Sequence, residues 1–253
     1  MKVSIITATF NSDKTLADTI QCVQGQDYPD IEHLIVDGGS KDGTIDIIKS
    51  MENHIHKWIS EPDKGIYDAM NKGLKMATGD IVAILNSDDF YPNNQVISKV
   101  VSALKENGAD TAYGDLQYVD PKETSRIVRN WKAGDFSSNK FYVGWMPPHP
   151  TFFVKREVYE KYGNFDTSFW TSADYELMLR FLFKHAVSTV YIPEVLVKMR
   201  TGGQSNINLA NRLKANKEDR RAWKINGLKP RFYTTWLKPL RKVSQFKRKW
   251  LRF

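Results

Sequence analysis

The stretch Asp80-Ile81-Val82-Ala83-Ile84-Leu85-Asn86-Ser87-Asp88-Asp89 begins as an apolar run and ends in two adjacent acids. Its uncharged, mostly branched residues up to Leu85 are typical of a short strand buried on both faces, as inside a parallel sheet. In open α/β sheets, ligands bind beyond the carboxyl ends of such strands. Asp88 and Asp89 would supply hard oxygen ligands there. Such ligands suit Mg²⁺ or Mn²⁺, and the cation would hold a phosphate-bearing substrate. For the acid pair alone, a solvated turn capped by Asp is the stronger alternative.

Strands and helices alternate through the first half of the chain. Strands are predicted at 3–10, 31–36, 56–59 and 81–85, and helices at 13–25, 45–51 and 66–77. Three strand-helix repeats with short connections predict a parallel sheet with helices on both sides. The second half is less regular. Further helices are predicted at 96–104, 157–162 and 173–183, further strands at 109–119, 151–154 and 187–192, and long loops at 120–148.

The overall composition is that of an ordinary globular protein. The chain has 253 residues, of which 41% are hydrophobic and 26% are charged, enough for one large α/β domain with an appendage. A single cysteine, Cys22, excludes an internal disulfide and fits a reducing compartment. We find no signal-peptide pattern and no apolar run of membrane-spanning length, and therefore expect a cytoplasmic protein.

Positive charge is concentrated near the end of the chain. Residues 211–253 hold 15 Lys and Arg residues against two acids, Glu218 and Asp219, whereas residues 1–210 are mildly acidic. We therefore predict a domain of residues 1–210 followed by a basic, aromatic-rich helical extension of residues 211–253. The large apolar side chains of this extension are Trp223, Phe232, Tyr233, Trp236, Leu237, Leu240, Phe246, Trp250, Leu251 and Phe253.

Basic residues interleaved with large aromatics suit short helices lying on an anionic membrane surface. This pattern predicts peripheral attachment to the inner face of the cell membrane. In the alternative, the aromatics pack on the body and the charges are solvated. A nucleic-acid-binding protein is a rival interpretation of the basic tail. The acidic body argues against it, because such proteins usually carry their positive charge on the folded face.

A glycine-rich turn, Asp37-Gly38-Gly39-Ser40-Lys41-Asp42-Gly43-Thr44, follows the second predicted strand. The pattern is not G-x-G-x-x-G, which disfavours a dinucleotide-binding fold. An acid at a strand end can accept hydrogen bonds from a base or ribose, and glycines let a ring approach the backbone closely. A plain turn capped by Asp42 is the alternative.

Four segments together resemble glycosyltransferase family 2: Thr7-Ala8-Thr9-Phe10-Asn11, the Asp37 turn, Asn86-Ser87-Asp88-Asp89 and the acid Asp174. The resemblance covers about residues 1–205. It implies a GT-A fold, a Rossmann-like, mostly parallel α/β sheet flanked by helices, and inverting transfer of a sugar from a nucleotide-sugar, most often a UDP-sugar. Residues 60–73 look like the subgroup that builds bacterial surface polysaccharides, which implies a glycan or lipid-linked glycan acceptor.

The resemblance also implies the residues of the donor site. The residues expected to bind the nucleotide-sugar are Thr7, Thr9, Asn11, Asp37, Asp63, Ser87 and Asp88. Among these, Asp37 and Asp63 would lie near the base or ribose. Asp88 matches the last acid of the family's Asp-x-Asp motif, which holds the divalent cation, Mn²⁺ or Mg²⁺. Asn86 replaces the first acid, so the site loses one charge, for which Asp89, as a second ligand, or a donor phosphate would compensate.

Asp174 matches the catalytic acid of the family. It would act as the base that removes a proton from the acceptor hydroxyl as that oxygen attacks the anomeric carbon. The family usually has Glu-Asp here, whereas this chain has Ala173-Asp174. A first-turn acid favoured by the helix dipole is the alternative, and the two roles can coexist.

The second half offers four more candidates. His149 is a candidate for an acceptor-site or metal-proximal role, although a lone histidine is more often structural. Trp145 and Trp170 are candidate sugar-stacking platforms, although most tryptophans belong to the core. Arg200 would close over the donor diphosphate, unless it belongs to an ordinary loop.

A sugar nucleotidyltransferase, which also binds phosphates and a metal ion, is the alternative enzyme. It would need a glycine-rich, Lys- or Arg-bearing loop after the first strand. Thr9-Phe10-Asn11-Ser12 is not such a loop. The sequence therefore favours the glycosyltransferase.

Overall fold

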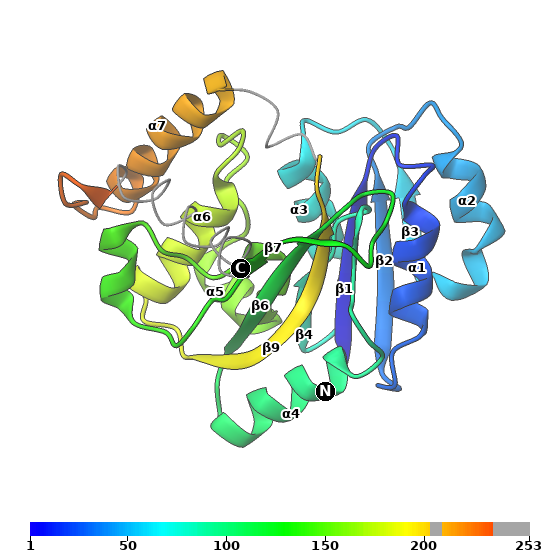
Figure 1. The fold of residues 1–253 in the computed structure, drawn as a ribbon, viewed down its shortest axis with the longest axis horizontal. Coiled ribbons are helices and arrows are strands. Elements are labelled where there is room, and N and C mark those ends of the chain that lie inside the picture. The colour runs from blue at the N-terminus through cyan, green and yellow to red at the C-terminus, as the bar shows by residue number, and fades with distance from the viewer. Residues whose placement is uncertain (203–208, 235–253) are drawn as a thin grey trace, which may run out of the picture.

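One mixed β-sheet forms the centre of the molecule (Figure 1). The computed structural model describes residues 1–202 and 209–234. Within these ranges the strands are β1 (Val3–Thr9), β2 (Ile31–Asp37), β3 (Lys57–Ser60), β4 (Ile81–Ile84), β5 (Asp89–Phe90), β6 (Thr111–Val119), β7 (Ile127–Trp131), β8 (Phe153–Lys155) and β9 (Thr189–Arg200). Their order across the sheet is β3-β2-β1-β4-β8-β6-β9-β5, and β7 pairs with β6.

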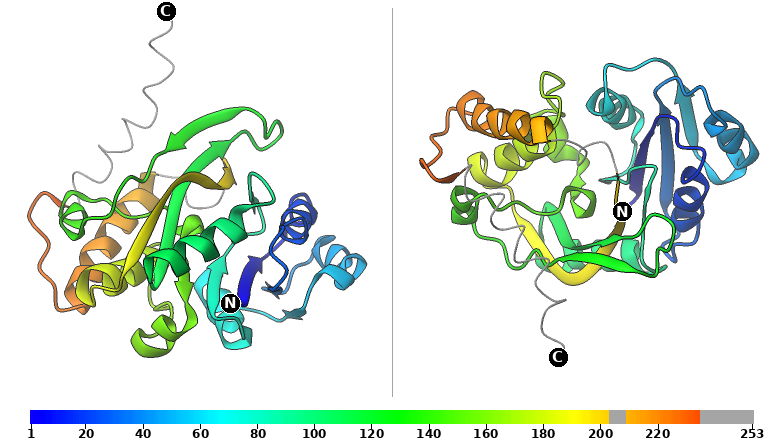
Figure 2. Two further views of the ribbon diagram at one scale, coloured as in Figure 1. Left: turned by 90° about the horizontal axis from the view of Figure 1, so that it is seen from below. Right: turned by 45° about the horizontal axis from the view of Figure 1, so that its top comes forward.

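Helices flank this sheet on both sides (Figures 1 and 2), which confirms the predicted α/β class. They are α1 (Leu16–Gln24), α2 (Thr44–Ser50), α3 (Ile66–Met76), α4 (Val96–Asn107), α5 (Arg156–Tyr162), α6 (Ala173–Met178) and α7 (Leu209–Ile225). In Figure 1, α1 and α2 lie at the β1–β3 end of the sheet, and α5, α6 and α7 lie on the side of β6 and β9.

The first half of the chain forms the predicted parallel sheet. β1 pairs in parallel with β2 and β4, and β2 pairs in parallel with β3. Every residue of β1 is buried, because helices cover both faces. Ile6 packs with the apolar face of α3, and Ile5 packs with the side chains of α4 on the opposite face. Gly73 lets α3 approach closely, since a Cβ there would lie 2.3 Å from Cγ2 of Ile6.

The second half is a mixed sheet. β8 runs antiparallel to both β4 and β6, and β9 runs parallel to β6 and antiparallel to β5. The predicted loop of residues 120–148 contains β7, which sequence reasoning missed. Ile127 and Val128 of β7 are each 41% exposed. Its pairing with β6, rather than a buried apolar face, therefore defines this strand. Likewise β9 extends well past the strand predicted at 187–192, because it pairs along β6 as far as Arg200.

Helix α7 packs against the body. Trp223 is fully buried, with the ring of Tyr142 stacked at 5.2 Å and the ring of Phe183 at 5.1 Å. For Trp223, then, the aromatic side chain packs on the body and is not available to a membrane. Tyr233 and Phe232 belong to the described residues, whereas the aromatics from Trp236 onward lie outside them. None of the helices described here combines the length and apolar character needed to cross a membrane.

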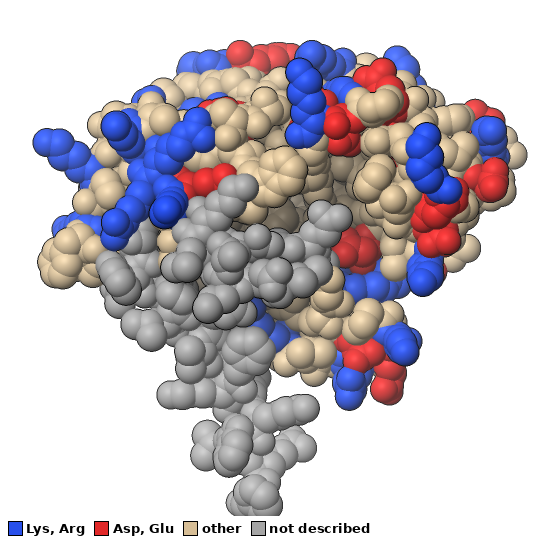
Figure 3. All heavy atoms as spheres, turned by 90° about the horizontal axis from the view of Figure 1, so that it is seen from above, with Lys and Arg blue, Asp and Glu red and all other residues tan. Residues whose placement is uncertain are grey.

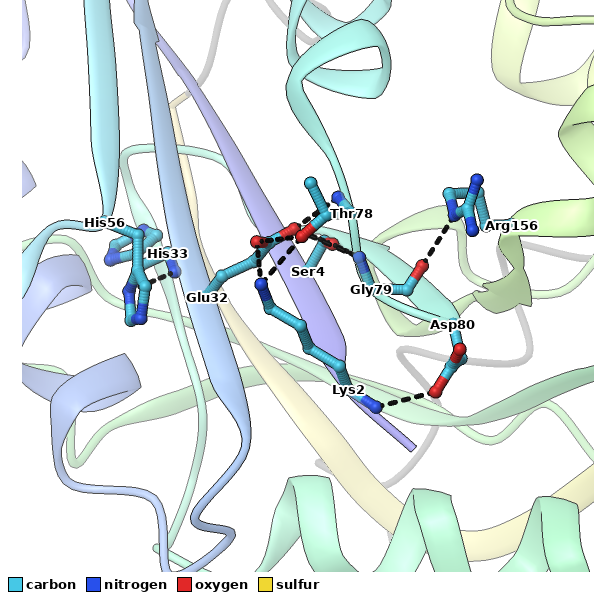
Figure 4. A network of polar contacts seen from close by, with 9 residues as sticks. All are labelled: Lys2, Ser4, Glu32, His33, His56, Thr78, Gly79, Asp80 and Arg156. Atoms are coloured by element: carbon cyan, nitrogen blue, oxygen red, sulfur yellow. Dashed lines mark hydrogen bonds and ion pairs between the residues drawn. The ribbon is translucent and has the colours of Figure 1, made fainter.

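A polar network ties the amino ends of the parallel strands together (Figure 4). The buried carboxylate of Glu32 in β2 accepts hydrogen bonds from Ser4 of β1, from the backbone N–H and hydroxyl of Thr78, each at 2.6 Å, and from Gly79 N at 3.1 Å; it also pairs with Lys2. Burial alone would raise the pKa of Glu32. The hydrogen bonds from Lys2, Ser4 and Thr78 outweigh it and lower that pKa to about 2.

Replacing Glu32 by Gln tests this network. Because the folded-state pKa lies below the ordinary value of 4.5, the carboxylate's stabilisation is fully present above that value and is lost as pH falls toward about 2. We expect the wild type to exceed Glu32→Gln in free energy of unfolding by a constant amount above about pH 6, and by clearly less near pH 3. Urea denaturation across this range measures the difference. A difference that does not change with pH would contradict the prediction.

Candidate active site

The carboxyl ends of β1, β2 and β4 meet at one edge of the sheet. Thr9 at the end of β1 pairs in register with Asp37 at the end of β2, and Asp88 follows β4. Figure 3 looks onto the molecule from above and shows a hollow near the centre of this surface. This is the edge at which ligands of open α/β sheets bind.

Asp37 and Asn11 organise the turn after β2. The carboxylate of Asp37 is fully buried and accepts hydrogen bonds from Gly39 N and Ser40 N at 3.0 Å and from the Ser60 hydroxyl at 2.6 Å. The side-chain oxygen of Asn11 accepts a hydrogen bond of 2.9 Å from Lys41 N. Both side chains thus shape the turn, and the carboxylate of Asp37 is already occupied by the protein.

A small open platform lies beside this turn. A Cβ on Gly38 would lie 2.3 Å from Oδ2 of Asp63 and 3.4 Å from the ring of Phe10, so the missing side chain leaves room for both groups. The ring of Phe10 is 54% exposed. Sequence reasoning missed Phe10 as a site residue. Its position directly after the strand-end residue Thr9 is the signal that could have found it.

Asp88 is a partly exposed carboxylate at the end of β4. Its backbone carbonyl accepts a hydrogen bond of 2.9 Å from Arg200, which also pairs with Asp18 and lies 4.8 Å over the ring of Phe90. Burial raises the pKa of Asp88, and the charges of Arg200 and His149 oppose this shift. Because Arg200 is only 7% exposed, its observed role is to fix the Asp88 corner.

Asp89 does not face the same space as Asp88. Its carboxyl group is fully buried and accepts a hydrogen bond of 3.1 Å from the Asn86 amide. Burial and the neighbouring charge of Asp88 raise its pKa well above the ordinary value, which disfavours the charged form that a cation needs. The predicted metal ligand Asp89 is therefore not supported by its position.

The amide oxygen of Asn86 is buried and has no hydrogen-bond partner among the residues described. In the same part of the chain, no three His, Cys, Asp or Glu side chains converge as a metal site would require. The corner therefore presents one partly exposed carboxylate, that of Asp88, which is a hard ligand of the kind that Mg²⁺ and Mn²⁺ prefer. Further ligands would have to come from elsewhere, such as a bound phosphate.

Burial argues against a side-chain contact at two more predicted residues. The Thr7 hydroxyl lies inside the sheet, 2.9 Å from Nε2 of His33. Trp145 is 5% exposed and donates a hydrogen bond of 3.0 Å to the carbonyl of Ala133 within an aromatic cluster. Both side chains belong to the core, which disfavours the ligand contacts predicted for them.

Thr9 and Ser87 are also largely buried, but they lie at the strand ends. Thr9 is 4% exposed, and its hydroxyl has no partner within the described ranges. The hydroxyl of Ser87 lies 2.8 Å from that of Ser12. Ser87 thus links the Asp88 corner to the turn after β1.

Asp174 lies in the first turn of α6, and both of its carboxylate oxygens are held. Oδ1 accepts a hydrogen bond of 3.2 Å from the Tyr67 hydroxyl of α3, and Oδ2 lies 3.3 Å from Nδ1 of His149. Burial and the charge of Asp174 raise the pKa of Tyr67 well above its ordinary value, so its hydroxyl remains a donor. The Asp174 side chain is 18% exposed and that of His149 31% exposed.

His149 connects the two halves of the site. It contacts Asp174 directly, and its charge opposes the burial that raises the pKa of the Asp88 carboxyl group. Trp170, four residues before Asp174, is 66% exposed. A held carboxylate and an exposed ring thus belong to the α6 side, and the Asp88 corner belongs to the sheet. This arrangement can deprotonate a bound hydroxyl next to a phosphate-bearing substrate.

Comparisons with known proteins agree with this geometry. The family described as Glycosyl transferase family 2 matches residues 4–170. An uncharacterized glycosyltransferase of Mycobacterium tuberculosis is 34% identical over 180 residues, which cover 70% of this chain and 68% of that protein.

Two groups of solved structures share the fold. TarS of S. aureus in complex with UDP-GlcNAc superposes with a TM-score of 0.65 at 17% identity, covering 89% of this chain and 65% of that one. The mannosyltransferase PcManGT of Pyrobaculum calidifontis, in complex with GDP-Man and Mn²⁺, gives a TM-score of 0.66 at 19% identity, covering 94% and 72%. At these identities the likeness concerns the fold alone, and it confirms the predicted GT-A architecture.

Proposed function

The chain belongs to glycosyltransferase family 2 and is therefore a sugar-transferring enzyme, and we propose that it moves a sugar from a nucleotide-sugar to an acceptor hydroxyl with inversion. One observation carries the proposal. The accessible carboxylate of Asp174 is held by Tyr67 and His149, and His149 also lies near Asp88. A base for the acceptor thus lies close to a corner suited to the donor diphosphate.

The donor is proposed to be a UDP-sugar. The similar structures were solved with UDP-GlcNAc and with GDP-Man, which supports a nucleotide-sugar of one of these types. Its base would lie on the platform of Phe10, Gly38 and Asp63, where an exposed ring can stack and a carboxylate can accept hydrogen bonds. The free hydroxyl of Thr9 at the neighbouring strand end would face the nucleotide.

A divalent cation, Mn²⁺ or Mg²⁺, would be held by Asp88 and by the donor diphosphate. When bound, it would stabilise the negative charge that develops on the leaving nucleotide. The protein's own part is to place Asp88, which Arg200 does by holding its backbone carbonyl. Asp174 then accepts the proton of the acceptor hydroxyl. The hydrogen bond from Tyr67 and the contact with His149 keep its carboxylate oriented during this step.

The acceptor is proposed to be a lipid-linked glycan at the inner face of the cell membrane. The exposed ring of Trp170 beside Asp174 suits stacking against a sugar. Basic side chains gather over α7 in Figure 3, and Ile225 and Phe232 nearby are 46% and 89% exposed. These features favour contact with an anionic surface. Trp223 takes no part in it, because it is buried.

Replacing Asp88 by Ala should abolish Mn²⁺-dependent binding of UDP and abolish transfer, while the fold persists, because the cation loses its protein carboxylate. Asn86→Asp is the matched variant. It adds a ligand charge and should tighten Mn²⁺ binding. Calorimetric titration of Mn²⁺ and UDP measures both. Unchanged UDP affinity in Asp88→Ala would remove Asp88 from the site.

Replacing Asp174 by Asn keeps the shape of the side chain but removes its ability to take a proton. Turnover should fall about a hundredfold or more, while donor affinity stays nearly constant. Asp46→Asn is the control, because Asp46 is also a first-turn acid but belongs to α2, on the opposite side of the molecule. Release of the nucleoside diphosphate in the presence of acceptor measures turnover. Comparable rates for wild type and Asp174→Asn would assign the base elsewhere.

The membrane proposal is tested by flotation with anionic liposomes. The truncation is placed after residue 234, because residues 218–226 pack on the body and their removal would expose the core. The full chain should float at low salt and detach partly at high salt, since each basic residue near the surface contributes about 1 kcal/mol. The truncated chain should float much less. Equal flotation would place the contact on the body, and no flotation of the full chain would refute the proposal.

A further inference from the structure

Helix α7 holds the chain on both sides of Asp174. On the amino-terminal side, Arg221 donates hydrogen bonds to the carbonyl (3.0 Å) and hydroxyl (2.6 Å) of Ser168. On the other side, Trp223 donates a hydrogen bond of 2.8 Å to the hydroxyl of Tyr175. Asn226, just beyond the helix, donates one of 3.0 Å to the buried carboxylate of Glu176. The segment that carries the base is thus fixed from one helix far along the chain.

Glu218 makes the central contact of this set. Its Oε1 accepts a hydrogen bond from Trp170 N at 2.9 Å, and its Oε2 accepts two from Thr171, from N at 2.8 Å and from the hydroxyl at 2.7 Å. Glu218 is only 9% exposed. A buried carboxylate that satisfies three donors is a strong anchor, and removing it leaves those donors without this partner.

We propose that Glu218 is a positioning residue for the acceptor half of the active site. It contacts no reacting group. Instead it fixes the backbone of Trp170 and Thr171, and so sets where the ring of Trp170 and the carboxylate of Asp174 lie. The proposal rests on the role of Asp174 as the base. Under this proposal α7 is part of the catalytic domain, although the basic composition of the helix predicts an extension outside that domain.

The geometry explains why this anchor acts on catalysis. Tyr67 and His149 hold only the end of the Asp174 side chain, at 3.2 and 3.3 Å. From Thr171 the backbone runs into the first turn of α6, which carries Asp174. In this turn, Glu176 N donates a hydrogen bond of 3.0 Å to the carbonyl of Ser172. Without Glu218, the entry to this helix would shift, and the two contacts on the carboxylate could not both be kept. A displacement of about 1 Å at a reacting group can lower a rate about a hundredfold.

The test compares Glu218→Ala and Glu218→Gln with Glu32→Gln in the full chain. Glu32→Gln alters a buried carboxylate at the opposite edge of the sheet and leaves the Trp170–Thr171 loop untouched. Hydrogen exchange followed by mass spectrometry reports on residues 168–176 directly. Transfer rates and UDP affinity are measured well below the unfolding temperature of every variant.

We expect faster exchange in residues 168–176 of Glu218→Ala, with unchanged exchange in residues 31–44. Turnover should fall about tenfold to a hundredfold with UDP affinity within about twofold of wild type. Glu218→Gln keeps one acceptor oxygen and should show intermediate exchange and turnover. If Glu218→Ala does not fold, Glu218→Gln takes its place in the comparison. Glu32→Gln should lose thermal stability but keep its turnover.

Unchanged exchange in residues 168–176 would overturn the proposal. So would a turnover loss in Glu218→Ala no larger than that in Glu32→Gln, because Glu218 would then be merely a stabilising residue. If the wild type transfers no sugar, the proposed function fails. The exchange measurement, which needs no activity, still decides whether Glu218 fixes this segment.

Discussion

The architecture depends on one strand, β1, which is buried on both faces between two parallel neighbours. Every side chain from Val3 to Thr9 is buried, and a fully buried aliphatic side chain contributes about 1.5–3 kcal/mol. A slip of one residue would exchange the two faces and remove Ile6 from its close contact with Gly73 of α3, so this packing fixes the register. Because all three strands run in the same direction, their carboxyl ends open at one edge. The Glu32 network holds the opposite ends together.

The two halves of the site are built differently. The donor side consists of turns at the ends of neighbouring strands, so the sheet itself positions Phe10, Asp63 and Asp88. The acceptor side is assembled from α3, the turn at His149, α6 and α7, which lie far apart in the sequence. Polar side-chain contacts hold these pieces at Asp174. The acceptor side is therefore the half in which single substitutions distant in sequence should change catalysis.

Sequence reasoning identified the parallel half of the sheet because apolar runs and strand-helix alternation are local patterns. It also singled out Asp174 and His149, whose side chains lie 3.3 Å apart, and Asp88, whose role stays a prediction. It could not tell that Thr7 and Trp145 are buried, since burial depends on the helices packed above them. Tyr67 lies within residues 60–73, whose resemblance to a subgroup gives this side chain no role of its own. Glu218 is one of just two acids in the basic tail, and this isolation is a signal of an inward-facing side chain that could have been used.

Composition predicts a domain boundary at residue 210. The structure has α7 packed against the body there, which composition alone does not reveal. A helix rich in Lys and Arg can still bury one narrow face, here the face of Glu218, Ala222 and Trp223. The residues from 235 onward lie outside the described ranges, so their separate character and membrane contact remain proposals. The roles proposed for Asp88, Asp174 and Glu218 do not depend on residues 235–253.

The central claim is that this edge of the sheet binds a nucleotide-sugar and releases the nucleotide. It is tested most directly by incubating the purified protein and Mn²⁺ with a panel of UDP-, GDP- and dTDP-sugars, and identifying the phosphorus-containing product. We expect release of a nucleoside diphosphate, most strongly UDP, and much less when the cation is chelated. Release of pyrophosphate in a parallel incubation with a nucleoside triphosphate and a sugar phosphate, with no diphosphate formed from any nucleotide-sugar, would contradict this.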